Sequence, residues 1–200
     1  MTVAVTNLPT SPIYVTGSPR LVSYATDQKS SLGGNTQRLT RLGSRFAIDV
    51  QYPPMIYSDA QQFLVALVQS ETVALSIPVP QRGLTIGTPG SPVVNGNGQA
   101  GLALAIRGAA AGYTVQLGQF LSVITGGRRS LYMCTSATTL NGSGNGTVPI
   151  GPMLRTTPSD GDTVELATPR LEGFLPIGAA KWSIEMLIRI GIAFSIEEDR

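Results

Sequence analysis

The residues that most often do chemistry in proteins are scarce here, and their scarcity limits what the chain can do. Its 200 residues include no histidine and a single cysteine, Cys134. Zinc sites built on histidine or cysteine, Ser-His-Asp triads and Cys-His dyads are therefore excluded within this sequence. One thiol cannot form a disulfide with itself, so we expect Cys134 to be a small buried apolar side chain. Acid–base or metal chemistry is left to the carboxylates.

Four acids gather between residues 160 and 172: Asp160, Asp162, Glu165 and Glu172. Paired carboxylates can bind a metal ion or act as acid and base, and a glycoside hydrolase sets two of them apart across a cleft. The simpler interpretation is a turn whose Asp160 and Asp162 side chains accept hydrogen bonds from nearby backbone N–H groups. Because no nucleophile is placed beside a base, we expect no enzyme, no catalytic residue, no metal and no cofactor.

Residues 96–101 have the spacing G-x-G-x-x-G, which also occurs in dinucleotide-binding proteins. Such a site needs a strand before the motif, a helix after it and an acid about 20 residues further on. The next acid in this chain is Asp160. We therefore expect a glycine-rich β-turn at this position.

Three other residues could contact a ligand. Arg128 and Arg129 follow two glycines at an expected hairpin tip, where they could hold a phosphate or a sugar or simply be the solvated end of a turn. The second interpretation is favoured. Tyr113 is one of three aromatic residues in the middle of the chain on which a sugar ring could stack. Possible ligand contacts are therefore Tyr113, Arg128 and Arg129.

A basic stretch occupies the N-terminal third, opposed there by Asp27: Arg20, Lys29, Arg38, Arg41 and Arg45. These cations could contact nucleic acid or an acidic partner, or they could lie on a solvated loop. Few aromatic residues alternate with them for base stacking, so the solvated loop is favoured. The net charge of the whole chain, +2, is too small to indicate nucleic acid or membrane binding.

The composition favours an all-β protein with many turns. Charged residues make up 13% of the chain, which also has 23 glycines and 14 prolines. Globular proteins usually contain about 25% charged residues and fewer glycines and prolines. The sequence contains no run of 18 apolar residues, so we expect no membrane span. It also lacks a basic start followed by an apolar block, so we expect no signal peptide.

The middle of the chain differs in charge from its ends. Residues 72–159 contain no Asp, Glu or Lys. We interpret this change as an inserted domain over residues 83–159. Turn signals recur there every eight to twelve residues, with short apolar runs between them. This spacing predicts a small β-barrel or sandwich of five or six strands.

The flanks carry clearer periodicities. Apolar residues alternate over residues 45–52, which predicts a half-buried strand ended by two prolines. Ser58 and Gln61 have the spacing of a capping box, and apolar residues then follow at helical spacing. We therefore expect a helix over about 59–70 with Ser58 as its N-cap, followed by a strand over 73–79.

The longest periodic signal lies near the C-terminus, where apolar residues occupy every second position from Trp182 to Ile196. This pattern predicts one long strand or a bent pair of strands. Such a strand would let both chain ends join one sheet, and an unpaired edge on it would be completed by a second copy. The expected oligomer interface consists of Ile188, Ile190, Ile192, Phe194 and Ile196.

The order of these features resembles that of the distal tail proteins of long-tailed bacteriophages, from about residue 19 onward. The resemblance rests on the basic loop, Tyr52-Pro53-Pro54-Met55 before the helix, the glycine-rich residues 98–101, residues 152–161 and the Trp182-Ser183-Ile184 start of the last strand. One departure is Gln119, where members of this family often carry Asp.

The resemblance implies a structural virion protein that is mainly β. Residues 1–82 and 160–200 would form a tail-tube-like β-domain with one helix, and 83–159 an inserted barrel of oligonucleotide/oligosaccharide-binding (OB) type. Copies would form a hexameric ring at the tail tip, assembled in the host cytoplasm. The ring would join the tail tube protein to the tail-tip hub protein and leave a channel through which DNA passes without specific binding. The alternative is a carbohydrate-binding module of a tail tip that contacts the host surface through the barrel.

Overall fold

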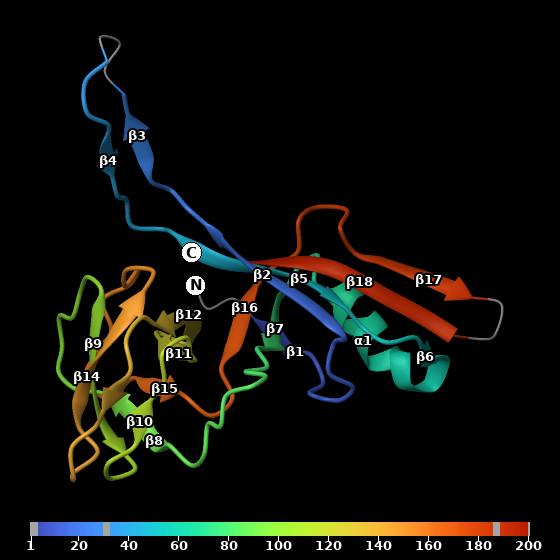
Figure 1. Ribbon diagram of the computed structural model, residues 1–200. Helices are drawn as coiled ribbons and strands as arrows, with labels where there is room; N and C mark the ends of the chain where they lie inside the picture. The colour runs from blue at the N-terminus through green and yellow to red at the C-terminus, as the bar shows by residue number, and fades with distance from the viewer. Residues whose placement is uncertain (1–3, 30–32, 186–188, 200) are drawn as a thin grey trace.

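The computed structural model describes residues 4–29, 33–185 and 189–199. It is mainly β with one helix, and it consists of an open sheet and a closed barrel (Figure 1). The open sheet takes its strands from both ends of the chain, and the barrel takes its strands from the middle. The predicted fold class, mainly β with one helix and a small barrel, is confirmed.

The open sheet is antiparallel except for the pairing of its first strand, β1, with β7. Two short strands pair with the long C-terminal strand in addition to the main path. In spatial order the main path is β1 (Val5–Asn7), β7 (Ala74–Pro78), β16 (Arg170–Phe174), β18 (Arg189–Glu198), β5 (Arg45–Gln51) and β2 (Thr16–Val22), and the additional strands are β6 (Met55–Ile56) and β17 (Lys181–Glu185).

The core of this sheet lies where β5 and β18 meet helix α1 (Tyr57–Gln69). Ile48 of β5 is directly opposite Ile196 of β18, so their side chains share one face. Phe63 and Leu67 of α1 are buried in the same apolar cluster. Alternation therefore predicted correctly which side of β5 is buried, because only one face of the strand packs against the helix.

The helix starts differently from the prediction. Its N-cap is Ile56, which has an extended backbone and makes no side-chain cap, and Ser58 lies inside the first turn with its hydroxyl on the Asp59 carboxylate. The expected capping box is therefore wrong. The reason is that Met55 and Ile56 pair with β18, so the chain stays extended up to Ile56 and turns into the helix immediately afterwards.

The long C-terminal alternation is two antiparallel strands. β17 pairs with β18 from Lys181 opposite Ala193 to Glu185 opposite Arg189, which agrees with a pair of strands and excludes a single long one. Farther along, β18 comes very close to β16. A Cβ added to Gly173 of β16 would lie 1.9 Å from the carbonyl oxygen of Glu197, so only glycine fits at this crossing.

The barrel closes with six strands around its own apolar core. Val164 of the last strand and Leu166 just after it are buried in that core, so the barrel extends beyond the boundary expected at residue 159. The boundary was expected where the acids resume, at Asp160, so the composition gave no sign that the strand after it belongs to the barrel. In spatial order the strands are β11 (Phe120–Thr125), β12 (Arg128–Cys134), β14 (Gly146–Gly151), β9 (Ala103–Ala109), β8 (Gly90–Val94) and β15 (Thr163–Glu165), and a separate ribbon pairs β10 (Thr114–Val115) with β13 (Thr138–Thr139).

A ribbon of two short strands, β3 (Thr26–Gln28) and β4 (Gln37–Leu39), continues from the hairpin of β2 and β5. It projects away from the sheet, the barrel and α1 (Figure 1). We call the described residues that connect β2 to β5, 23–29 and 33–44, the arm. Among the described residues, no helix is both long and apolar enough to cross a membrane.

Candidate assembly surface and polar sites

The predicted oligomer interface on β18 is not available to a partner. Ile190, Ile192, Phe194 and Ile196 are buried in the core beneath α1, and Ile188 lies outside the described residues. Most of both edges of β18 is also occupied, because β5 and β6 pair with one side of it and β16 and β17 with the other. For the four described residues the prediction is wrong, since alternation shows that one face is buried but not by what.

The open margins of the sheet lie elsewhere. Within the described part of the chain, β1 pairs only with β7, β2 only with β5, and β17 only with β18. β1 and β2 end the main path of the sheet and β17 lies beside β18, so each of the three presents an edge of unpaired backbone groups. Pro19 in β2 has no N–H to donate, so the middle of that edge is a poor template for a further strand.

The arm lacks a core of its own. Every residue of β3 and β4 is exposed, and the two strands pair only with each other among the described residues. Arg38 donates from Nε and Nη2 to Asp27 across the ribbon at 2.7 and 3.0 Å, and this hydrogen bonding lowers the pKa of Asp27. Because water screens an exposed ion pair, this one contributes little to stability. An isolated two-stranded ribbon is at best marginally stable in water, so the strands of the arm are held mainly by the hairpin of β2 and β5 from which they extend.

The basic stretch of the N-terminal third follows the arm and its base. Arg45 donates to Glu197 of β18 at 2.8 and 2.6 Å and lies over the Tyr24 ring, which anchors the arm to the sheet. Arg20 is 3.8 Å from Asp49. Lys29 and Arg41 are exposed and make no ion pair with any described residue. Most of the stretch is therefore neutralised within the chain, which leaves two cations on the arm.

The barrel is joined to the sheet through a buried carboxylate, Glu198 of β18. Glu198 accepts hydrogen bonds from the backbone N–H of Phe46 in β5 at 3.0 Å and of Leu131 in β12, and it forms an ion pair with Arg155. Burial raises the pKa of Glu198, and Arg155 with the two N–H groups offsets part of that rise. Phe120 of β11 adds an edge-on contact with Phe46, with ring centroids 5.5 Å apart. One side chain thus satisfies groups from both bodies.

Arg128 and Arg129, expected as the solvated end of a turn or as ligand contacts, belong to the same joint. Arg129 donates to Glu165 of the barrel at 3.1 and 3.2 Å and to Glu172 of the sheet at 3.4 Å. Burial raises the pKa of Glu172, and the charge of Arg129 offsets part of the rise. Arg128 pairs with Asp199 at 3.1 Å. Both arginines therefore bind acids of their own chain.

Tyr113 has a separate structural setting. It packs against the barrel core, and its hydroxyl accepts a hydrogen bond from Gln119 Nε2 at 2.9 Å. Gln119 is itself fully buried and also caps the turn before β11 by accepting from the N–H of Gln116. The half-buried ring is held by these contacts, and Tyr113 and the two arginines have different partners. The three residues expected to contact a ligand do not form one site.

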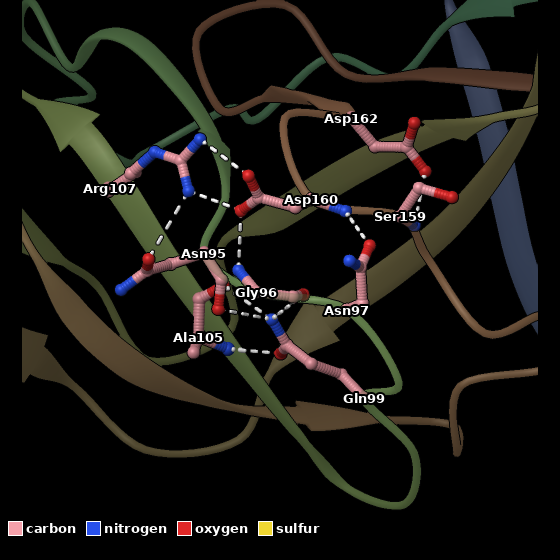
Figure 2. A network of polar contacts seen from close by, with 9 residues as sticks. All are labelled: Asn95, Gly96, Asn97, Gln99, Ala105, Arg107, Ser159, Asp160 and Asp162. Carbon is pink, nitrogen blue, oxygen red and sulfur yellow. Dashed lines mark hydrogen bonds and ion pairs between the residues drawn. The ribbon is translucent and has the colours of Figure 1, made fainter.

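Figure 2 shows a polar network that connects the carboxylate pair of the sequence to the glycine-rich loop. Asp160 forms an ion pair with Arg107, whose Nη2 lies 3.0 Å from Oδ2, and it accepts from the N–H of Gly96 at 2.7 Å. Its own N–H donates to Asn97 Oδ1 at 2.7 Å. Asp162 accepts from the N–H of Ser159 at 2.8 Å. As expected, Asp162 caps a backbone N–H of its own turn, whereas Asp160 caps one in the loop between β8 and β9, 64 residues away in the chain.

The environment of Asp160 determines its charge. The hydrogen bonds from Arg107 and from the N–H of Gly96 lower the pKa of Asp160 to about 2. The carboxylate is therefore ionised at neutral pH, and a group in this state does not donate a proton as a general acid. Its geometry fits a clamp that holds residues 95–97 to residues 159–162.

The glycine-rich residues 96–101 form a loop between β8 and β9, with a strand instead of a helix after it. Gln99 closes this loop: its side-chain amide donates to the carbonyl oxygens of Asn95 and Ala105, at 3.0 and 3.1 Å, and its Oε1 accepts from the N–H of Ala105 at 2.7 Å. The N–H of Gly96 is already used by Asp160. The turn interpretation is confirmed, since a phosphate site needs free N–H groups at a helix start.

Two features were missed at the sequence level. One is the joint at Glu198 and Arg155, which are 43 residues apart in the chain and gave no spacing signal. The other is a groove beside the end of α1, where Trp182 stays partly exposed. The exposed tryptophan was visible only as one member of an alternating pattern. No protein-family model and no curated protein matches this chain.

Proposed function

We propose that this chain is a structural subunit that assembles into a ring at the distal end of a phage tail. The ring joins the tail tube to the tail-tip hub and leaves a channel for DNA. The observation that carries the proposal is the combination of two kinds of incomplete surface on one sheet: edge strands with unpaired backbone groups and a projecting arm without a core. A neighbouring chain covers these surfaces.

The geometry agrees with a head-to-tail ring. The arm extends from the β2 and β5 side of the sheet, whereas β17 lies across β18 from β5. These are different surfaces, and a head-to-tail contact between them gives a ring when the rotation between copies closes and a filament when it does not. A ring satisfies every subunit equally, and a two-fold dimer would do so only if both copies exchanged their arms at once.

The barrel suits a part carried on the outside of such a ring. It closes on itself and so has no open edge to pair, and the joint at Glu198 fixes it to the sheet. A DNA channel needs no base readout, which agrees with a basic stretch that is largely paired within the chain. The charged groups of the barrel's polar sites bind one another. This supports a structural role for the barrel as a domain fixed to the ring.

Electron microscopy of the purified chain tests the proposal. We expect annular particles with a central hole and a constant number of subunits, which image classification would count. The barrel should appear as a peripheral lobe of each subunit. Particles of single-subunit size at every protein concentration would contradict the proposal, and so would open filaments without rings.

A further inference from the structure

A groove of about 670 Å³ lies between the C-terminal end of α1 and the segment from β16 to β17. Its lining is apolar except at Ser70 and Glu71. Val68 is 63% exposed and Trp182 44% exposed, and Ile177 is fully exposed. Large apolar side chains gathered on a surface in this way mark an interaction site more often than a solvated face.

The groove exists because α1 is too narrow to cover β17. Trp182 is directly opposite Ile192, and Ile184 opposite Ile190, so both side chains face the same side of the sheet as the buried core. Ile190 and Ile192 are covered beneath α1, whereas Ile184 is 76% exposed. The apolar face of the sheet therefore continues beyond the helix without cover.

The arm carries side chains that match this groove. Leu42 is 64% exposed, and Leu39 also lies on the surface. Arg41 stands between them in the sequence and is one of the arm cations without an ion pair among the described residues. Of the residues that line the groove, Glu71 is the charged one, and it too makes no ion pair within the described part of the chain. The arm and the groove are thus complementary both in charge and in apolar surface.

We propose that residues 39–42 of one copy dock in the α1–β17 groove of the next copy, with Leu39 and Leu42 on Trp182 and Val68 and with Arg41 facing Glu71. A second copy is the occupant because the arm points away from the groove of its own chain (Figure 1). The inference rests on the proposed ring and names the contact that repeats around it. It also accounts for both an unsupported ribbon and an uncovered apolar face.

A charge exchange in the full-length chain tests this contact, with assembly followed by sedimentation velocity over a concentration series. Glu71→Arg and Arg41→Glu each bring like charges together, and each raises the concentration needed for assembly about tenfold. The double variant restores opposite charges with their places exchanged and assembles as the wild type does. Lys29→Glu is the matched control, because it reverses an arm cation outside residues 39–42 and leaves assembly unchanged.

The outcomes separate this contact from the ring itself. Both residues are exposed, so circular dichroism should show every variant folded. If the single variants assemble at the wild-type concentration, if the double variant stays weak, or if Lys29→Glu weakens assembly equally, the docking is overturned. If the wild-type chain itself remains monomeric, the proposed function fails first.

Discussion

β18 and the arm are both β-structure, yet they have opposite relations to the rest of the molecule. β18 is paired along most of both edges and buries every second side chain, four of them in the core beneath α1. The strands of the arm pair only with each other within the described residues and bury no side chain. The comparison separates the contacts that stabilise one chain from the surfaces that remain free to contact a neighbouring chain. The interface was predicted on β18, but the unsatisfied surface is on the arm.

The largest expected effect comes from placing the same charge in each region. Ile196→Asp puts an unpaired carboxylate in the sheet core, which should cost more than about 4 kcal/mol and prevent stable folding. Leu42→Asp on the exposed arm should change the free energy of unfolding by less than about 0.5 kcal/mol. Urea unfolding followed by circular dichroism measures both. Similar losses in the two variants would show that the arm is part of the folded core.

The next effect concerns the joint that β18 makes with the barrel. Glu198→Ala leaves Arg155 as a buried charge without its partner and removes the acceptor of two backbone N–H groups, which should cost about 3–5 kcal/mol. Glu197→Ala, which removes the neighbouring partly buried pair with Arg45, should cost less, about 1–3 kcal/mol. Chemical denaturation gives both values. Equal costs would mean that Glu198 does not hold the two bodies together.

Alternation and turn spacing predicted much of the fold, because they report which face of a strand is buried and where the chain must turn. They placed β5, the region of α1 and a barrel of about six strands. They could not place the helix start at Tyr57, which depends on Met55 and Ile56 pairing with β18. These patterns could not tell a face that a helix buries from a face that a second chain buries. The oligomer interface was therefore predicted at residues that α1 covers.

The site residues were harder to predict than the strands for a related reason. The turn role of Asp162 followed from local chemistry and was confirmed, whereas Asp160 binds the N–H of Gly96, 64 residues away. Arg129 binds Glu172, and Arg155 binds Glu198, at separations of 43 residues. Such contacts depend on how the barrel is mounted on the sheet. No local pattern contains that information.

A smaller effect is expected when the arm is shortened. A variant in which residues 26–42 are replaced by Asn-Gly keeps β2 and β5 as a tight hairpin, so its free energy of unfolding should stay within about 1 kcal/mol of the wild type. Thermal unfolding measures this value. A larger loss would show that the arm stabilises its own chain and so weaken the contrast with β18.

The smallest expected effect is the acid dependence of the clamp in Figure 2. The pKa of Asp160 is lowered to about 2, so its contribution to stability is present above the unfolded value of 3.8 and is lost as pH falls through about 2. Asp160→Asn removes the charge that Arg107 binds. The difference in unfolding temperature between wild type and variant should therefore be constant from pH 7 to 5 and shrink toward zero near pH 2. A difference that grows on acidification would contradict the clamp.

Sedimentation velocity of the wild-type chain beside the arm-shortened variant tests the ring most directly. We expect the wild type to form one closed assembly of fixed subunit number, and the variant, folded as judged by circular dichroism, to sediment as a monomer. A wild-type chain that stays monomeric, or a variant that assembles as readily as the wild type, would contradict an annular structure that depends on the arm.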